Sequence, residues 1–411
     1  MRGSILLFAL ACRLRVGRFL GIVSSCVAAS TTLACSSCRH GDSEGTSARA
    51  DSGAAATTAP APPSLPAMPR PAGWLYTKGG RILVSDGKGG GAVWVGRGVN
   101  VDDVFLCGFN CRLDLASSGA LLGTLVTGLI REWRPTFLRI SLWMASCPEE
   151  ASWTLDPARY KVPMTSAIEA AGRAGVYVLV TVRSHASMIG QDAIDGDPEA
   201  TGIPSDRTNT PDPILYPQGT DETYTALVDS FAHAGFVLFG VANEPGGDKL
   251  PNARIAASMK HAVETIRGEE DRLHVPHHVV SVQGNGWTDD VAFYAASPLP
   301  FDDVVYEVHG YPPKASSYTY PNIPVIIGEY GSLNGEAAAH FFADVEAKGI
   351  PSLAWDFDTF SDCGPDLVAA NESATEIVPT DWGKRVRSYL LAHASTPLRE
   401  PEDIARPPPA P

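Results

Sequence analysis

The chain has 411 residues, of which 44% are hydrophobic and 19% are charged, and its formal net charge at pH 7 is −14. A chain of this length and composition can bury one large hydrophobic core or two ordinary ones. The net negative charge argues against nucleic acid or an anionic membrane face as a partner, because both are recognised through basic patches, and it is compatible with a neutral substrate.

The first 35 residues have the pattern of a secretion signal. Arg13, Arg15 and Arg18 precede an apolar stretch at 19–34, which ends in small residues before Cys35. No other stretch is apolar and long enough to cross a bilayer. We therefore expect residues 1–35 to be a signal peptide that exports the chain.

The end of this leader resembles the cleavage box of bacterial lipoproteins. Residues 32–35 read Thr-Leu-Ala-Cys, with Thr in place of the usual Leu; residues 23–26 read Val-Ser-Ser-Cys and fit the box better, but leave a very short apolar region before Cys26. We expect a lipid anchor at Cys35 and a cell-surface or periplasmic location. An ordinary signal peptide with secretion, or an uncleaved anchor, is the alternative.

Two segments have the composition of disordered chain. Residues 36–71 are rich in Ser, Ala, Thr, Gly and Pro with few large apolar side chains, and residues 396–411 end in Pro-Pro-Pro-Ala-Pro. Neither segment can bury enough apolar surface to order itself. The first is predicted to be a tether and the second a tail, which leaves 72–395 as the folded domain.

The folded domain opens with short apolar runs that are separated by glycine turns. The runs at 74–76 and 81–84 flank a Lys-Gly-Gly turn, and a second glycine-rich turn at 86–91 precedes the first long apolar run. This pattern predicts a short N-terminal β-hairpin. The glycine cluster lacks the Gly-Lys-Ser/Thr ending of a phosphate loop and opens no helix.

From there to residue 392, apolar runs alternate with helical periods. The predicted strands lie at 94–99, 136–142, 176–182, 236–242, 278–282, 304–308, 325–328 and 352–357. The predicted helices lie at 116–133, 162–174, 221–234, 253–267, 291–296, 336–347 and 382–392. The alternation predicts an α/β fold, the (β/α)8 TIM barrel. A doubly wound sheet is the alternative, although no Gly-x-Gly-x-x-Gly follows the first strand.

Two of the apolar runs end in a glutamate. Asn243-Glu244-Pro245 follows one buried run, and Glu329 ends another. A carboxylate at the end of a buried strand is costly unless something there uses it. We therefore interpret Glu244 and Glu329 as a functional pair.

Polar and aromatic residues gather at the same end of the other predicted strands. The full set is Asn100, Arg139, His185, Asn243, Glu244, Gln283, His309, Tyr311, Glu329 and Trp355. Strand ends of a barrel form one rim, where the active sites of such barrels lie. Any one of these residues could be a satisfied buried polar group, but together they predict a site.

Over residues 74–393 these motifs, in this order, resemble glycoside hydrolase family 5, the cellulase and mannanase group of retaining (β/α)8 glycosidases. The resemblance implies that Glu244 of Asn-Glu-Pro is the acid/base and that Glu329 is the nucleophile. The family's supporting residues match Asn100, Arg139, Asn243, His309, Tyr311 and Trp355, and its histidine after strand three is loosely matched by His185.

The chemistry of a retaining glycosidase agrees with this resemblance. Two carboxyls about 5 Å apart are needed, one protonated to assist the leaving oxygen and one ionised to attack the anomeric carbon. We expect Arg139 and Tyr311 to keep Glu329 ionised and oriented, and Glu244 to carry the proton. The Asn243 amide suits the sugar 2-hydroxyl, and Trp355 offers a flat apolar face to a sugar ring.

Other residues have two interpretations each. Trp143, Trp153 and Trp287 could be further sugar platforms or packed rim aromatics, and Asp356 and Asp358 could contact substrate or cap the last strand. Glu307 lies two residues before His309, so it also points inward, and we expect a structural charge that pairs with an arginine. The histidines of the segment 274–278 are expected in a solvated loop on the opposite rim, not at a metal site.

The loops add two expectations. The long segment 184–220 is rich in Gly, Pro and Asp and is predicted to shape one wall of the cleft. Cysteines of an exported domain form disulfides, and the loops of three neighbouring strands carry Cys107, Cys111, Cys147 and Cys363, with the pairing left open.

The sequence therefore predicts an exported retaining β-glycoside hydrolase that is monomeric and needs neither cofactor nor metal. Its partner is a β-glycan, cleaved by an endo-β-1,4-glucanase or β-mannanase action, which are the main activities of the family it resembles. Exo-β-glucosidase or transglycosylase action on the same scaffold, or a non-catalytic surface glycan-binding barrel, are the alternatives.

Overall fold

The computed structural model describes residues 70–101, 115–143, 160–183, 220–245, 251–313, 315–331, 333–358, 365–369 and 376–394. The predicted leader, nearly all of the tether, the tail, the long loop, His185, Trp153 and the four cysteines of the folded domain lie outside these residues. Within the described part, none of the helices combines the length and the apolar character that a bilayer crossing requires.

The described strands of the main sheet form a closed barrel of eight parallel strands in chain order. They are β4 (Arg97–Val101), β5 (Phe137–Trp143), β6 (Tyr177–Arg183), β7 (Val237–Gly240), β8 (Val280–Gln283), β9 (Val304–Gly310), β10 (Val325–Tyr330) and β11 (Ser352–Ala354). Pairing of β11 with β4, with Leu353 opposite Gly98, closes the ring. The predicted TIM barrel is confirmed, and the doubly wound alternative is wrong.

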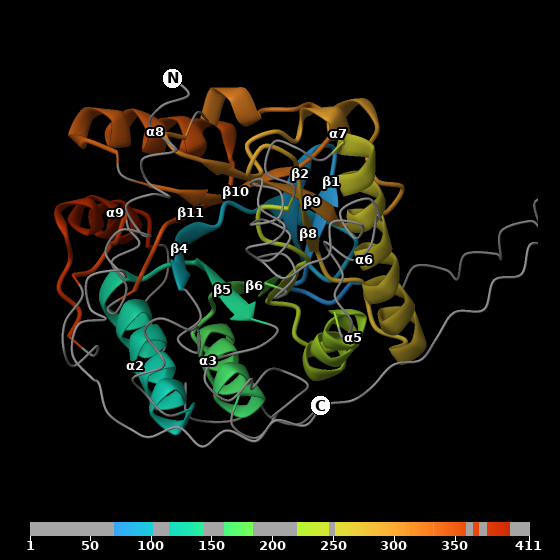
Figure 1. Ribbon diagram of the computed structural model, residues 1–411, viewed down its shortest axis with the longest axis horizontal. Helices are drawn as coiled ribbons and strands as arrows, with labels where there is room; N and C mark the ends of the chain where they lie inside the picture. Colours follow the sequence, from blue (N-terminus) through green and yellow to red (C-terminus); the bar gives the residue numbers. More distant parts are fainter. Residues whose placement is uncertain are drawn as a thin grey trace, which may run out of the picture. The chain divides into compact units, whose positions relative to one another are not determined.

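Helices surround the strands on the outside (Figure 1). They are α2 (Leu115–Trp133), α3 (Lys161–Arg173), α5 (Thr220–Phe231), α6 (Asn252–Leu273), α7 (Ala292–Ala296), α8 (Gly335–Lys348) and α9 (Asp381–Ala392), with a 3-10 turn η3 (Ala315–Tyr318). Each long helix turns an apolar stripe to the barrel, as α2 does with Leu122, Leu125 and Leu129, all of them fully buried. In the segment before β10 the described residues form the 3-10 turn η3.

The N-terminal hairpin is part of a three-stranded antiparallel sheet of β1 (Leu75–Lys78), β2 (Arg81–Ser85) and β3 (Gly91–Val93). The third strand was not predicted, and the first barrel strand starts at Arg97 instead of Trp94. The reason is that residues 91–93 pair with β2. Trp94 packs its ring on Phe137, with centroids 4.9 Å apart, before the chain enters the barrel.

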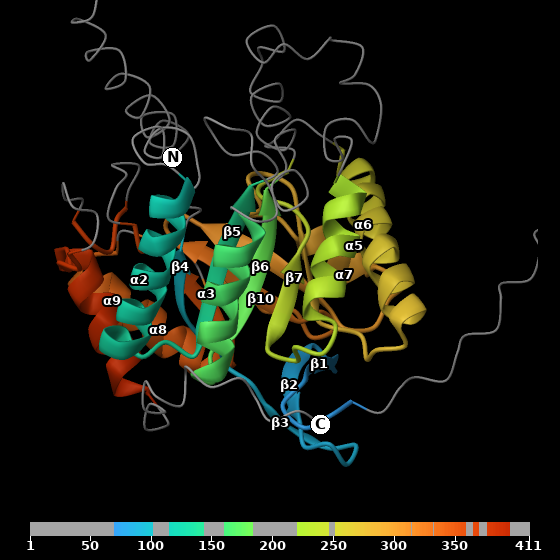
Figure 2. The ribbon, with the colours of Figure 1, turned by 90° about the horizontal axis from the view of Figure 1, so that it is seen from below.

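This small sheet lies at the end of the barrel where the strands begin (Figure 2). The Thr77 amide donates to Asp303, which precedes β9, at 2.8 Å. The Tyr177 hydroxyl, at the start of β6, donates to the Gly73 carbonyl at 2.8 Å. The sheet thus caps the rim opposite to the strand ends.

The prediction of a solvated histidine loop is wrong for His278. Its residue is 1% exposed, and its ring packs on Trp74 with centroids 4.5 Å apart. Its Nδ1 lies 2.8 Å from a carboxylate oxygen of Glu270, which pairs with Arg267 at 2.6 Å. Helix α6 runs on to Leu273, six residues beyond its predicted end, and Glu270 in this extension is buried in the same cluster.

The barrel interior has an apolar layer below and a polar layer above. Phe137, Leu179, Leu238 and Leu353 are buried in one cluster near the strand starts. Two residues further along, the inward positions of several strands are polar, because side chains on a strand alternate between its two sides. These polar residues are Asn100, Arg139, Thr181, Ser281 and Glu307, all 0% exposed.

Candidate active site

Arg139 is the centre of the polar layer and binds residues from strands all around the barrel. Its guanidinium lies 2.7 Å from Glu329 Oε1 and 2.9 Å from Glu307 Oε1. Its other hydrogen bonds go to Asn100 Oδ1 at 3.0 Å, Thr181 Oγ1 at 3.0 Å and Asn243 Oδ1 at 2.7 Å. A buried cation is tolerated only when it is paired and hydrogen-bonded, and Arg139 meets both conditions.

Glu329 lies near the end of β10 and is held by donors on both of its oxygens. Arg139 donates to Oε1, and the Tyr311 hydroxyl donates to Oε2 at 3.1 Å. The Glu329 side chain is 6% exposed, whereas Tyr311 as a residue is 40% exposed. A carboxylate with a cation and a hydroxyl donor is favoured in its ionised form. The carboxylate lies at the bottom of the site, and the Tyr311 ring lies on its rim.

Glu244 follows β7 in a backbone conformation that favours glycine, with φ of 48°. A non-glycine residue in this left-handed region costs about 1 kcal/mol or more, and such residues concentrate at functional sites. The conformation is held by Gln283 at the end of β8, whose Oε1 accepts from the Glu244 amide at 2.5 Å. The Glu244 side chain is 18% exposed, so it reaches solvent more than its partner does.

His309, on β9, connects the carboxylates of the site. Its Nδ1 lies 2.7 Å from Glu244 Oε1 and 3.4 Å from Glu329 Oε2. Its Nε2 lies 3.0 Å from Glu307 Oε1. Burial of the ring opposes a positive charge, but the adjacent carboxylates, Glu329 first, outweigh burial and raise the pKa of His309 to about 9. The imidazole is therefore a cation at neutral pH.

Glu307 lies beneath this histidine and is fully buried. Burial opposes its ionisation, but the charge of Arg139 and the hydrogen bond from His309 outweigh burial and lower the pKa of Glu307 to about 2. Ser281 donates to its second oxygen at 2.7 Å. The predicted pairing of this buried charge with an arginine is confirmed.

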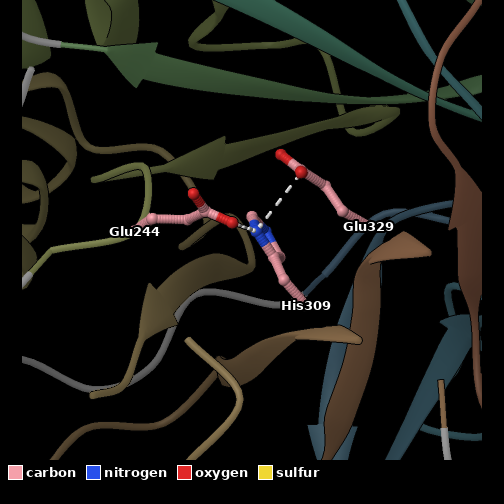
Figure 3. Close-up of side chains that lie close together, drawn as sticks. All are labelled: Glu244, His309 and Glu329. Carbon is pink, nitrogen blue, oxygen red and sulfur yellow. Dashed lines mark hydrogen bonds and ion pairs between the residues drawn. The ribbon is translucent and has the colours of Figure 1, made fainter. Parts of the chain in front are cut away.

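The two glutamates at the strand ends face each other across His309 (Figure 3). Carboxylate oxygens of Glu244 and Glu329 and a ring nitrogen of His309 lie within 4.8 Å of one another. Glu329 is thus bound by a cation and a tyrosine hydroxyl, and Glu244 is bound by a histidine. Their different surroundings allow one carboxyl to hold a proton while the other stays ionised.

This spacing would also suit a metal ion, but the bonds already formed disfavour one. Arg139 supplies positive charge to Glu329, and each ring nitrogen of His309 already faces a carboxylate. A metal would have to displace a protonated imidazole and compete with a buried guanidinium. The donor set fits proton transfer and nucleophilic attack better than it fits metal binding.

The structure brings together most of the predicted site residues. Asn100 donates to the Gly328 carbonyl at 2.9 Å, and Asn243, Glu244, His309, Tyr311 and Glu329 are joined by the contacts above. Trp355, directly after β11, is half-buried, and its amide donates to the Tyr330 carbonyl at 2.8 Å. His185 lies outside the described residues.

The remaining aromatic and acidic candidates are only partly placed. Trp287, half-buried, lies in the turn after β8 with φ of 58°. Asp356 and Asp358 are 2% and 1% exposed. Trp143 ends β5.

Gln283 was predicted as a rim residue without a role, and Thr181 was not predicted; both contact the site. Gln283 ends its strand, which is the signal that placed it in the rim set, and its bond to the Glu244 amide now gives it a role. Thr181 lies two residues after Leu179 on β6, and Leu179 is the strand partner of Arg139. Its inward direction follows from period-two alternation once the strand is known.

The family comparison covers the elements that carry this site. The model of the cellulase family, glycosyl hydrolase family 5, matches residues 124–361, more than half of the chain. The chain belongs to glycosyl hydrolase family 5. The matched segment contains Arg139, Glu244, His309 and Glu329 in the order in which the barrel strands present them.

An endoglucanase is distantly similar to this family 5 protein. It is 23% identical to endoglucanase MaCel5A of Microbulbifer sp. (strain ALW1) over 231 residues, which are 51% of this chain and 38% of the relative. The chain therefore spans about two fifths of the length of that relative.

Solved structures share the fold. The catalytic domain of endoglucanase Cel5A of Thermobifida fusca superposes with a TM-score of 0.53 at 17% identity, covering 78% of this chain and 98% of that one. A β-mannanase of Streptomyces thermolilacinus gives 0.53 at 19% identity, covering 80% and 99%. A β-glucanase of Saccharophagus degradans gives 0.56 at 15% identity, covering 82% and 98%. At these identities the likeness shows the barrel alone.

Proposed function

We propose that this family 5 protein hydrolyses a β-linked glycan by double displacement, with net retention of the anomeric configuration. The observation that carries the proposal is the spacing of the two glutamates, whose carboxylate oxygens lie within 4.8 Å of each other. Retaining glycosidases have carboxyls about 5–5.5 Å apart, and inverting enzymes need about 6.5–9.5 Å to fit a water molecule. The spacing supports retention.

In the first step Glu329 attacks the anomeric carbon while Glu244 protonates the leaving oxygen. The donors on Glu329 hold one carboxylate in place for attack and keep it ionised. Glu244 is the more exposed of the pair, which suits a group that must reach the glycosidic oxygen. The bond from the anomeric carbon to the leaving oxygen breaks, and an ester to Glu329 forms.

In the second step the ester consumes the negative charge of Glu329, so Glu244 can act as a base. It takes a proton from water, the water oxygen attacks the anomeric carbon, and the ester bond breaks. The two inversions give net retention. Asn243 is fixed by Arg139 at 2.7 Å beside this centre, which supports its role toward the sugar 2-hydroxyl.

The substrate that we propose is a β-1,4-linked glucan or mannan cleaved internally. The support is the names of the relatives: an endoglucanase at 23% identity, and solved β-mannanase and endoglucanase structures, of which one holds cellotetraose and another mannohexaose. The neutral, hydroxyl-rich chains of such glycans agree with a chain whose net charge is −14.

We also propose that the protein is exported and carries its lipid anchor at Cys35. The support is the leader of residues 1–35, with arginines before an apolar stretch and a cysteine after small residues. Long glycans do not cross a membrane, so an enzyme that acts on them has to lie outside it. Metabolic labelling with a fatty acid, lost in Cys35→Ala but retained in Cys26→Ala, tests the anchor.

The decisive experiment is a panel of cellulose, mixed-linkage glucan, xyloglucan, mannan and β-1,3-glucan, with products separated by chromatography. Anomeric NMR of the first products reports retention or inversion. Retained products from glucan or mannan would support the proposal, and inverted products would refute the double displacement. Absence of any product would favour the glycan-binding alternative.

Two variants assign the roles. Glu329→Gln should abolish turnover and leave glycan binding largely intact, and a wild-type rate would refute the nucleophile. Glu244→Ala should fail on natural substrates, act on glycosides with good leaving groups, and be rescued by azide with a glycosyl azide of retained configuration. Glu169→Gln, on an exposed glutamate of α3, is the matched control and should leave the rates unchanged.

A further inference from the structure

Glu307 does not reach solvent, yet it touches two groups, Arg139 and His309, that bind the two strand-end glutamates. It is 0% exposed, and its two oxygens are bound by Arg139, His309 and Ser281 at 2.7–3.0 Å. A well-packed apolar side chain at such a position often gives a fold that is equally stable or more stable. Packing alone therefore does not account for a charge here.

The chain makes room for this carboxylate on a neighbouring strand. A Cβ at position 328 of β10 would overlap the Glu307 carboxylate, so only glycine fits there. Ser281 on β8 adds a donor from the other side. Three strands therefore accommodate the Glu307 carboxylate: β5 supplies a cation, β8 supplies a hydroxyl donor and β10 leaves space.

Glu307 dictates which ring nitrogen of His309 keeps its hydrogen. An ionised carboxylate can only accept hydrogen bonds, so the Nε2 of His309, 3.0 Å away, has to carry a hydrogen. The other ring nitrogen, Nδ1, then faces Glu244 Oε1 at 2.7 Å. In the cationic form of the imidazole Nδ1 also carries a hydrogen, which it donates to the Glu244 carboxyl.

We propose that Glu307 is a positioning residue that fixes the Nε2–H form of His309 and thereby sets the pH at which the His309–Glu244 pair releases its protons. The inference rests on the proposed acid/base role of Glu244. In this role Glu307, a buried anion, controls the pH range in which Glu244 carries its proton.

The charges around the pair give the direction of the effect. His309 faces Glu244 after β7, Glu307 on its own strand and Glu329 on β10, and Gln283 on β8 is neutral. Glu307 itself faces the Arg139 cation on β5 and the neutral Ser281 on β8. With Glu244 protonated, two cations balance two carboxylates.

Without the charge of Glu307, two cations would face a single carboxylate. Every proton on the pair would then be held less tightly, because a negative neighbour that favours protonation is gone. The pair would lose its protons at a lower pH, and Glu244 would lose its acid function earlier as the pH rises.

The test is the pH dependence of kcat/KM for Glu307→Gln, which keeps the size of the side chain and removes its charge. On aryl β-glycosides we expect the basic limb to move to lower pH by about one unit. Above the wild-type basic limb the loss should approach about tenfold for poor leaving groups and be small for good ones, since only the former need the acid. A purely structural role would lower both alike and leave the limb in place.

A second measurement does not depend on turnover. In protein labelled with ¹⁵N-histidine, the ring signals of His309, identified by their loss in His309→Asn, report its titration. The midpoint should fall by about one unit in Glu307→Gln and stay in Ser281→Ala, which changes a contact of Glu307 but not its charge. If Glu307→Gln does not fold, Glu307→Asp draws the carboxylate back and should give a smaller shift of the same sign.

The outcomes separate the two proposals. An unchanged His309 midpoint together with an unmoved basic limb would overturn the role of Glu307. A lowered midpoint in a protein that cleaves no glycan would support the positioning role and refute the proposed function instead. A lowered midpoint and a shifted limb in an active enzyme would support both.

Discussion

Replacing Arg139 by methionine should destabilise the protein severely, because it leaves two buried carboxylates without their cation. Methionine keeps the apolar volume of the side chain but removes the contacts to Glu307 and Glu329 at 2.9 and 2.7 Å. Breaking a buried ion pair from one side costs about 3–5 kcal/mol. Since a domain is stable by only about 5–15 kcal/mol, the loss should be a large part of the total.

The pKa of Glu307 gives an independent magnitude. It is about 2 in the fold, and about 4.3 in an unfolded chain, so the ionised form contributes about 3 kcal/mol at pH 7. This contribution is present above pH 4.3 and is lost as the pH falls through 2. In Arg139→Met the buried carboxyl should instead prefer its proton, so the variant should regain stability as the pH falls from 7 to about 4.

The assay is unfolding in urea, followed by circular dichroism, at pH 7 and at pH 4. Arg97→Met is the matched control, because Arg97 pairs with Glu346 at 2.5 Å with side chains 20% and 25% exposed. We expect that control to lose about 1 kcal/mol. Equal losses for the two variants, or a loss for Arg139→Met that does not shrink at pH 4, would refute the reasoning.

Three further predictions concern the same site. His309 has a pKa of about 9, above its value in the unfolded chain. Its protonation therefore contributes about 3 kcal/mol to the free energy of unfolding, which is present below pH 6.5 and lost as the pH rises through 9. Between pH 7 and about 9.5 the wild type should lose more stability than His309→Asn. Tyr311→Phe removes the donor to Glu329 and should lower kcat by about 10–100-fold, measured by steady-state kinetics with KM. Gly328→Ala should lower the melting temperature sharply, because its Cβ would overlap Glu307.

Controls for these variants lie elsewhere in the barrel. Tyr177→Phe removes a hydroxyl that bonds to Gly73 at the opposite end, so kcat should not change. Gly123→Ala adds a Cβ to α2 where nothing lies within 4 Å, and it should be neutral or stabilising by about 0.5–1 kcal/mol. Equal effects of Gly328→Ala and Gly123→Ala would contradict the steric argument, and an unchanged kcat in Tyr311→Phe would contradict a role of its hydroxyl.

The barrel and its rim were predictable because both depend on local patterns. Alternating apolar runs and helical periods set the order of the strands, and a polar residue after an aliphatic run marks the end of a strand. Glu244 and Glu329 stand out in this way within a few residues of sequence. Strand bounds moved by up to three residues where a neighbour in space decided them, as at Arg97, where residues 91–93 joined the small sheet instead.

His278 shows what local patterns cannot give. Three histidines among charged residues and a proline have the composition of an exposed loop. Burial of the third is decided by Trp74, about two hundred residues earlier in the chain, which covers it, and by Glu270, which accepts from it. A polar ring is buried at low cost only when partners bind it, and a short stretch of sequence around the ring does not show those partners.

Local patterns also cannot show which side chains contact each other within the site, and these contacts decide the chemistry. Glu307 and His309 point to the same interior from one strand, two residues apart, and period-two spacing alone makes them equivalent. Their depth separates them: Glu307 pairs in register with Gln283 and Ile326, and His309 pairs with Glu329 one level higher. The lower carboxylate meets the guanidinium of Arg139 and stays ionised, while the higher imidazole meets the carboxylates of the rim. One step along a strand thus separates a fixed charge from a group that hydrogen-bonds to the acid, and the pH profile of Glu307→Gln measures how strongly the two levels are coupled.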